Sequence, residues 1–391
     1  MRSPLHQQVD TLPDLVRATI DPFYTAVRHT ITPKLAQRVE RVYLTGCGDS
    51  HHAPLNAELA FEQLAGLPCT AMNAMQFARY KAGYLPERGH DTNLVIAVSV
   101  SGSASRTVEA MRMARQAKAV AVALTGNPNS ALAAAAELIM ETAVPPLPDE
   151  LQGMIVPGTR SYVASQLSLY LCALQLGEYR GHLSKTKANQ IRRELASMAD
   201  LIEETIAKSD STAMRIATDW QTAQQFVFCG SGPNYGTALF SAAKLLEASG
   251  DIAIAQDVEE WAHLQYFGRE QATPTFIISA GGWDNSRALE VATAAKQIGR
   301  RVVIVAPTAS ALAMSEEKDF LLETAVSPRE CFSPLLTCLP PTLFAACRAQ
   351  MINEPYFRNF GCGRSIEGGG GISRIRESDQ LESLNRDWRL V

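Results

Sequence analysis

Residues 42–48 of this 391-residue chain read VYLTGCG, an apolar run of β-prone residues that ends in two glycines. Such a run predicts a buried strand followed by a tight turn. A helical segment follows over residues 50–66. Residues 226–232 read FVFCGSG and repeat the run, and residues 234–250 repeat the helix. The chain therefore contains one α/β unit twice.

A second block of elements follows each copy in the same order of strand, helix and strand. Alternating buried strands and amphipathic helices predict a parallel sheet between helices. The fold class is therefore α/β, with two tandem doubly wound parallel-sheet domains of flavodoxin-like type. The blocks cover residues 93–99, 105–117 and 119–124 in the first copy, and 275–279, 286–298 and 301–305 in the second.

The duplication predicts five segments along the chain. A helical leader over residues 1–39 precedes the first domain, and a charged helical connector precedes the second. A tail rich in Gly and Arg follows, which we expect to lie over the site. The first domain covers residues 40–182, the connector 183–222, the second domain 223–352 and the tail 353–391.

Composition excludes several classes of protein. The formal charge of −4 forms no basic stripe that would bind nucleic acid, and no apolar run is long enough to span a membrane. The N-terminus does not resemble a signal peptide. Eight cysteines are scattered without metal-site spacing and are interpreted as buried thiols. We expect a cytoplasmic protein without metal or cofactor.

Two loops of the first copy are rich in small hydroxyl residues. Residues 46–50 read GCGDS, and residues 99–105 read SVSGSAS. Loops at the carboxyl ends of parallel strands bind ligands, and N–H groups at a helix start favour anions. Such residues also cap helices and turn the chain. Two such loops on one sheet favour one anion site per chain, since the second copy has lost most of its hydroxyls.

A dinucleotide site is the competing interpretation, because Gly46 and Gly48 are typical of the start of a Rossmann motif. The first copy lacks the third glycine and an acidic residue for a ribose. This interpretation is therefore disfavoured.

The loops GCGDS and SVSG, in a duplicated chain, resemble the sugar-isomerase (SIS) family. The resemblance covers residues 41–364 and is greatest to the isomerase half of glucosamine-6-phosphate synthase, to phosphosugar isomerases and to fructosamine-6-phosphate deglycases. It implies a phosphate site formed by Gly48, Ser50, Ser99, Ser101, Ser103 and Thr159.

The resemblance also implies the catalytic residues. Glu247 moves a proton between C1 and C2 of the sugar, and His263, reaching in from the neighbouring subunit, assists ring opening. Lys244 and Arg364 join this group. A carboxylate and an imidazole suit such proton transfers. The alternatives are an ordinary surface pair of Glu247 with Lys244, and a core histidine at 263.

Three departures from the family pattern limit the transfer. The 40 residues before the first strand are too few for a glutaminase, so we expect no glutamine-dependent synthesis. The second loop lacks the final Thr ligand, which Ser103 or Ser105 replaces in our interpretation. The tail keeps RNF at 358–360 but has no Lys, and its nearest cation is Arg364, with Arg374 and Arg376 as further candidates.

The sequence therefore predicts a cofactor-free aldose–ketose isomerase or deglycase of a phosphorylated sugar or amino sugar. It is expected to be a homodimer with shared active sites, without nucleic-acid or membrane partners. The alternative function is a non-catalytic sugar-phosphate-binding regulatory protein, and a nicotinamide enzyme is a third, weaker one. The identity of the sugar stays open.

Overall fold

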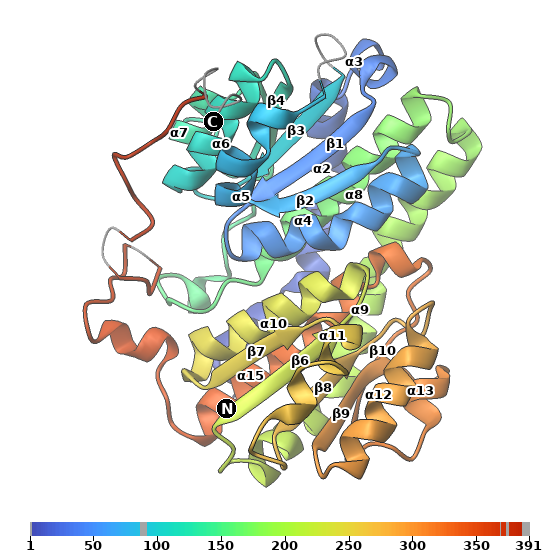
Figure 1. Cartoon of the computed structure of the whole chain (residues 1–391), viewed down its shortest axis with the longest axis vertical. Coiled ribbons are helices and arrows are strands. Elements are labelled where there is room, and N and C mark those ends of the chain that lie inside the picture. The colour runs from blue at the N-terminus through green and yellow to red at the C-terminus, as the bar shows by residue number, and fades with distance from the viewer. Residues whose placement is uncertain (1, 87–91, 368, 373–374, 385–391) are drawn as a thin grey trace. The chain divides into compact units, whose positions relative to one another are not determined.

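The chain folds into two compact units, each built on a five-stranded parallel sheet (Figure 1). The computed structural model describes residues 2–86, 92–367, 369–372 and 375–384. The predicted α/β class with two parallel sheets is confirmed. The first-sheet unit comprises Leu15–Pro145, Ser161–Ala196 and Ser373–Val391, and the second-sheet unit comprises Met1–Asp14, Pro146–Arg160 and Ser197–Ile372.

The first sheet has the strand order β2-β1-β3-β4-β5, which is the flavodoxin-like order. Strands β3 and β4 are buried along their whole length, because helices cover both faces of the sheet. This explains their unbroken apolar sequences. The strands are β1 (Arg41–Gly46), β2 (Cys69–Asn73), β3 (Asn93–Val98), β4 (Val120–Thr125) and β5 (Leu138–Glu141).

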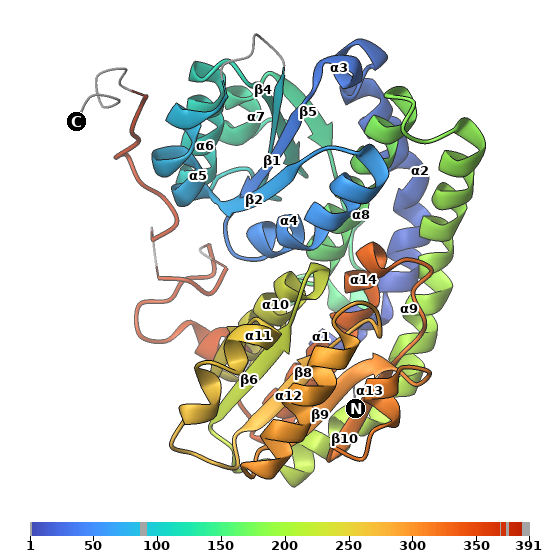
Figure 2. The same ribbon diagram turned by 45° about the vertical axis from the view of Figure 1, so that its right-hand side comes forward.

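Helices cover the two faces of the first sheet in separate groups (Figure 2). On one face, α5 (Ala74–Tyr80), α6 (Ser105–Gln116) and α7 (Ala131–Ala135) pack against alternate residues of β1, β3 and β4, such as Tyr43 and Val95. The other face carries α4 and α8. The remaining bounds are α2 (Leu12–Thr30), α3 (Pro33–Arg38), α4 (Asp49–Ala60), a π-helical turn (Phe61–Ala65), a 3₁₀ turn (Ala82–Tyr84) and α8 (Arg160–Tyr179).

The second sheet repeats the topology of the first, with the order β10-β9-β8-β6-β7. Read from the other edge, its order β7-β6-β8-β9-β10 corresponds to the order β2-β1-β3-β4-β5 of the first sheet. The predicted duplication is therefore a repeat of the sheet topology. The strands are β6 (Gln225–Gly230), β7 (Ile252–Gln256), β8 (Pro274–Ile278), β9 (Arg301–Pro307) and β10 (Phe320–Thr324).

The helices of the second-sheet unit also form two layers. On one face, α11 and α12 pack on β6, β8 and β9 around Trp261 and Ile277. On the other face, Phe344 of α15 contacts the rings of Phe226 and Phe276. The bounds are α1 (Pro4–Asp10), α10 (Pro233–Ser249), α11 (Val258–Trp261), α12 (Asn285–Gln297), α13 (Ala311–Met314), α14 (Pro334–Thr337) and α15 (Leu339–Met351), with 3₁₀ turns at Asp149–Leu151, Gln265–Phe267, Glu330–Phe332 and Tyr356–Phe360.

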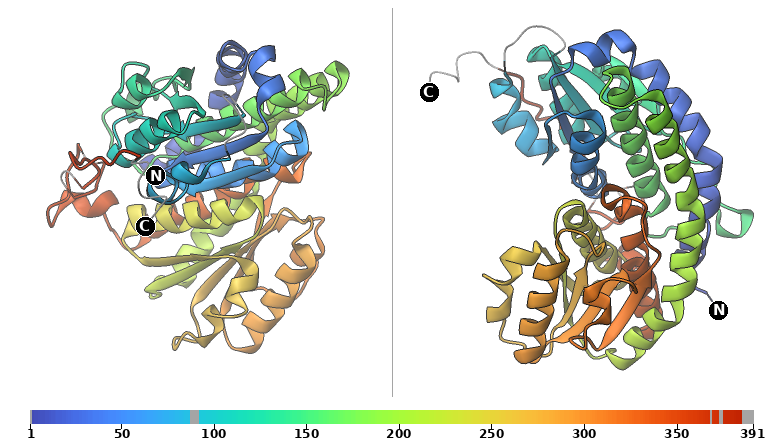
Figure 3. Two further views of the ribbon diagram at one scale, coloured as in Figure 1. Left: turned by 45° about the horizontal axis from the view of Figure 1, so that its top comes forward. Right: turned by 90° about the vertical axis from the view of Figure 1, so that its right-hand side faces the viewer.

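The predicted charged connector is one continuous helix, α9 (Lys185–Asp219), of 35 residues (Figure 3). Its apolar residues recur at helical spacing, and those such as Ile191, Leu195 and Ile202 are fully buried. Within the described ranges, no helix combines the length and apolar character needed to cross a bilayer.

Candidate functional site

The predicted site residues fall into two groups, one in each unit. The hydroxyl-rich loops that contain Gly48, Ser50, Ser99, Ser101 and Ser103 belong to the first-sheet unit. The second-sheet unit contains Thr159, Lys244, Glu247, His263 and Arg364.

The two hydroxyl-rich loops leave neighbouring parallel strands at the same edge of the first sheet. Strands β1 and β3 pair directly, with Thr45 opposite Ala97. The loop after β1 leads into α4 and the loop after β3 into α6. Their hydroxyl and N–H groups therefore meet at the carboxyl edge, where open α/β sheets bind ligands.

Two glycines shape the first of these loops. A Cβ atom on Gly46 would lie 2.0 Å from the carbonyl oxygen of Ser50, and Gly48 has φ 57° and ψ −132°. Such a conformation is essentially restricted to glycine. The second copy repeats both features, because a Cβ on Gly230 would lie 2.3 Å from the Asn234 oxygen and Gly232 has φ 53°. The glycines therefore fix the turn in both copies.

The serines of the second loop bond to one another and to backbone N–H groups of the same loop. Ser99 is buried, and its Oγ accepts a hydrogen bond from the Gly102 N–H at 3.2 Å. The Oγ atoms of Ser101 and Ser103 lie 2.9 Å apart and are exposed. Two exposed hydroxyls in contact can turn their protons toward an incoming anion.

The first loop contains a carboxylate, that of Asp49, and no Lys, Arg or His among residues 46–50. Asp49 follows Gly48 and pairs with His52 at 3.6 Å. Burial and the neighbouring His52 lower the pKa of His51 to about 4, so this ring is neutral at physiological pH. The loop therefore offers neutral donors to an anion, and compensating positive charge has to come from another segment.

Lys244 and Glu247 form an ion pair three residues apart on α10. Lys244 is 0% exposed, and its Nζ also lies 5.0 Å from the centroid of the Phe240 ring. A fully buried ammonium needs a compensating charge, and Glu247 supplies it. The pair has the i,i+3 spacing of the alternative interpretation, but its lysine is buried rather than exposed.

Glu247 lines a cavity of about 460 Å³ in the second-sheet unit. Arg364 lines the same cavity, so the structure brings together two of the predicted catalytic residues. Arg364 Nη1 donates to the Gly361 carbonyl at 2.8 Å. The other lining residues are Leu246, Gly250, Phe357, Arg358, Cys362 and Gly370, together with Gly361.

Arg358 and Cys362 are among the lining residues that were not predicted as site residues. Arg358 pairs with Glu354 at 3.1 Å and lies against Gly250, where a Cβ would be 2.7 Å from its Cδ. The RNF pattern at 358–360 is the sequence signal that marks this segment. The interpretation of all eight cysteines as buried thiols is wrong for Cys47 and Cys362, which are exposed.

His263 lies outside the cavity, just after α11. Its side chain is 64% exposed, and Nε2 lies 3.0 Å from Glu259. Glu259 also binds Arg287, and hydrogen bonds from Arg287 and His263 lower the pKa of its carboxyl group. The alternative of a core histidine is therefore wrong. His263 is not among the residues that line the cavity of Glu247.

Thr159 is 2% exposed, and both its N–H and its hydroxyl donate to Oε1 of Gln8, at 2.7 and 2.5 Å. Neighbouring Arg160 is also buried, and this burial lowers its pKa. A ligand that accepts a hydrogen bond from the Thr159 hydroxyl has to displace Gln8 or share this hydrogen bond with it.

Carboxylates occupy the second copy's counterparts of the anion loops. Ser279 donates to Asp284 at 2.7 Å, and Ser231 donates to Asp257 at 2.8 Å. The Trp283 N–H donates to Glu330 at 3.4 Å. These acids, which sequence reasoning missed, repel anions and occupy the donors that the loops offer. Within the described ranges, no three His, Cys, Asp or Glu side chains gather as metal ligands would.

Comparison with known proteins agrees with the duplicated fold. A model of the SIS domain matches residues 34–175. A glutamine–fructose-6-phosphate aminotransferase (isomerizing) from Gloeobacter violaceus is 28% identical over 94% of this chain. The match covers 58% of that relative, so this chain spans little more than half of its length.

Solved structures share the fold over nearly the whole chain. The C-terminal domain of a glucosamine-fructose-6-phosphate aminotransferase from Francisella tularensis superposes with a TM-score of 0.78 and 18% identity, over 90% of this chain and 97% of that one. A chain from Silicibacter pomeroyi, provisionally described as a phosphosugar isomerase, gives 0.69 and 19%, over 90% and 98%. The chain thus matches the SIS-domain model over residues 34–175, and over about nine-tenths of its length it shares the fold of the C-terminal domain of a glucosamine-fructose-6-phosphate aminotransferase.

Proposed function

We propose that the protein is an aldose–ketose isomerase, or an amine-releasing deglycase, of a phosphorylated sugar or amino sugar. The observation that carries this proposal is the pairing of Glu247 with a fully buried Lys244 at the wall of a cavity. The names of the similar proteins, an isomerizing aminotransferase and a phosphosugar isomerase, favour the same substrate class.

Glu247 acts as the base in this proposal. Its carboxylate removes the proton from the carbon next to the sugar carbonyl, which gives an enediol, and returns it to the neighbouring carbon. Lys244 pairs with this carboxylate and holds it in position. Arg364 stays protonated and stabilises the negative charge that develops on the substrate oxygen.

The serines and Gly48 anchor the phosphate in this proposal. Two loops of N–H and hydroxyl donors at helix starts suit a tetrahedral anion. The acidic loops of the second copy support one anion site per chain, because Asp257, Asp284 and Glu330 are incompatible with a second phosphate. The ligands are Ser50, Ser99, Ser101 and Ser103, with Thr159 if Gln8 yields its hydrogen bond.

His263 assists ring opening in this proposal, and it does so on a site of a second subunit. Its exposure supports this role, since a histidine that serves the partner has to lie on the surface. Large apolar side chains follow it in the sequence and are also exposed, which favours a covered interface. They are Leu264, Tyr266 and Phe267.

Turnover tests the proposal directly. The purified chain is incubated with fructose 6-phosphate or glucosamine 6-phosphate, and the aldose, the ketose and released ammonia are measured. Glu247→Gln is expected to lower kcat by about 100- to 10,000-fold, because it removes the base. Glu290→Gln, an exposed glutamate on α12 paired with Arg287, serves as the matched control.

Two outcomes contradict the assignment. Binding of both sugar phosphates without turnover would identify a sugar-phosphate-binding regulatory protein. Equal activity of the Glu247→Gln and control variants, with melting curves showing both folded, would remove Glu247 from the chemistry.

A further inference from the structure

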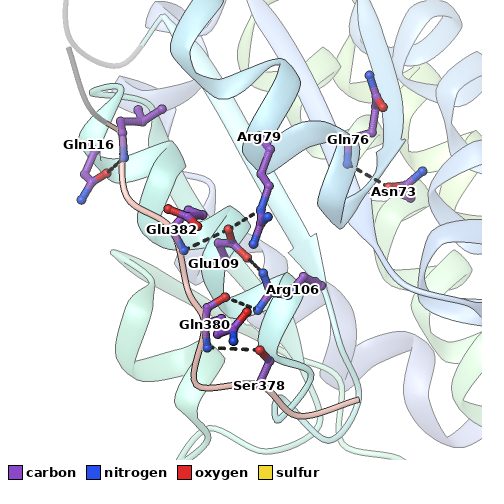
Figure 4. A network of polar contacts seen from close by, with 10 residues as sticks. Asn73, Gln76, Arg79, Arg106, Glu109, Gln116, Ser378, Gln380 and Glu382 are labelled. Carbon is purple, nitrogen blue, oxygen red and sulfur yellow. Dashed lines mark hydrogen bonds and ion pairs between the residues drawn. The ribbon is translucent and has the colours of Figure 1, made fainter. Parts of the chain in front are cut away.

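The chain's last described segment lies along α6 of the first-sheet unit (Figure 4). We name residues 376–384 the C-terminal latch. Alternate residues of the latch bond to α6 through their backbone. The Ser378 N–H donates to Ser105 Oγ at 2.8 Å, and the Glu382 N–H donates to Glu109 at 3.2 Å. Spacing by two is that of an extended chain, so an ordered peptide follows the helix.

Glu109 is the centre of this docking surface. Its side chain is 0% exposed and pairs with Arg79 at 2.9 Å and with Arg106. Arg106 Nη2 in turn donates to the Gln380 carbonyl at 2.7 Å. A buried carboxylate held by two guanidinium groups is fixed in place, so it offers the latch a fixed acceptor.

The end of the latch is fastened by an apolar contact. Leu384 packs against the core cluster formed by α5, α6 and β4, and its N–H donates to Gln116 at 2.7 Å. The segment is held in one register by this leucine and by backbone hydrogen bonds at residues 378, 380, 382 and 384.

The start of the latch lies beside the hydroxyl-rich loop. The Ser105 N–H, at the first residue of α6, donates to the Arg376 carbonyl at 3.2 Å. Ser105 stands two residues after Ser103. An arginine side chain reaches roughly 6–7 Å from its Cα, which is enough to extend across a loop of this size. The Arg376 side chain is exposed and has no carboxylate partner among the described residues.

We infer that the latch delivers Arg376 to the anion loop, where its guanidinium binds the anionic group of the substrate. This inference rests on the proposed function. Among the described residues close to the loop, His51 is neutral and both Arg79 and Arg106 already pair with Glu109, so none of these three offers it a free positive charge. A guanidinium binds phosphate or carboxylate oxygens in pairs and stays protonated. Arg374, the other candidate, lies outside the described residues.

Anion binding to the full chain tests the role of Arg376. Calorimetry and thermal shift are measured with inorganic phosphate and with fructose 6-phosphate. Arg376→Gln is expected to weaken both affinities about 10- to 100-fold, and Arg376→Lys less, because a lysine keeps the charge but loses the paired geometry. Glu377→Gln, an exposed neighbour, is the control and should bind more tightly than Arg376→Gln.

A pair of proline variants tests the latch. Glu382→Pro removes the N–H that Glu109 accepts, whereas Ser383→Pro removes an N–H for which no partner is found among the described residues. Glu382→Pro is expected to weaken phosphate binding as much as Arg376→Gln does, and to expose the amide of Ser378 to hydrogen exchange. Ser383→Pro should bind like the unchanged chain.

The outcomes separate this inference from the proposed function. Normal binding and activity in Arg376→Gln would overturn the inference and leave the proposed function intact. Loss of binding in Arg376→Gln but not in Glu382→Pro would show that the latch is not needed to position Arg376. If the unchanged chain binds neither phosphate nor fructose 6-phosphate, and Ser101→Ala gives the same result, the proposed anion site is wrong. The proposed role of Arg376 is then wrong as well.

Discussion

Asp284 is a largely buried carboxyl group at the start of α12. It accepts a hydrogen bond from Ser279, and its second oxygen, Oδ2, is buried without a partner among the described residues. Burial raises its pKa to about 6, and the neighbouring Glu330 and Asp257 act in the same direction. The folded protein therefore resists ionisation of a group that ionises freely in the unfolded chain.

The sign of the resulting pH dependence follows from the raised pKa. Between about pH 4 and pH 6 the folded state binds more protons than the unfolded state, so the free energy of unfolding falls as pH rises. Asp284→Asn is expected to stabilise the protein by about 2 kcal/mol at about pH 8 and to have little effect near pH 4. Urea unfolding at both pH values measures this, and an equal effect at both would contradict the raised pKa.

Single residues were predictable by type and spacing but not by environment. The spacing of Lys244, Glu247 and His263 is visible in the sequence, and so is the loss of hydroxyls in the second copy. The sequence does not show that Lys244 is fully buried or that carboxylates replace the lost hydroxyls. Both features depend on side chains from distant segments, such as Glu330. A local pattern carries no information on such contacts.

The strand-to-helix turns show how one residue fixes an element. In both copies a glycine at the end of the strand lets the first turn of the next helix approach the backbone closely. The space for a side chain is absent at Gly46 and Gly230, because the nearest atoms are carbonyl oxygens of Ser50 and Asn234. Backbone atoms cannot move aside as a flexible side chain can.

Gly46→Ala is therefore expected to shift the start of α4 and to destabilise the protein by about 3 kcal/mol. It should also weaken phosphate binding, because Ser50 lies in the displaced turn. Gly126→Ala is the matched control, since a Cβ there would meet its nearest atom, the Val100 oxygen, at 3.4 Å. Chemical denaturation and phosphate titration of both variants provide the measurement. Equal tolerance of the two alanines would refute the close approach.

The elements that sequence reasoning found are the central ones. Strands β1, β3, β4, β6, β8 and β9 have apolar, largely buried sequences, and each agrees with its prediction to within a few residues. The strands β2, β5, β7 and β10 are the edge strands of the two sheets, and they were missed because none of them is a continuous run of buried residues. Helix α15 was not predicted, and its Pro340 and Pro341 lie in its first turn, where prolines fit a helix.

At the scale of the molecule, two units of one topology carry opposite loop chemistry. The first-sheet unit presents hydroxyls and helix starts, whereas the equivalent loops of the second-sheet unit present carboxylates. Duplication has therefore been followed by divergence at the loops and conservation of the glycine turns. The copy that lost the anion donors contains the Lys244–Glu247 pair, which supports a division of roles between the copies.

This division, with an exposed His263, predicts complementation between defective chains. If His263 serves the site of a second subunit, a Glu247→Gln chain and a His263→Ala chain together form one intact site in each mixed dimer. Equal mixing gives half mixed dimers with one of two sites intact, so about one quarter of the unchanged activity is expected. The chains are unfolded together, refolded and assayed, and each variant refolded alone serves as the control. A mixture no more active than its separate components would show that His263 acts within its own chain or not at all.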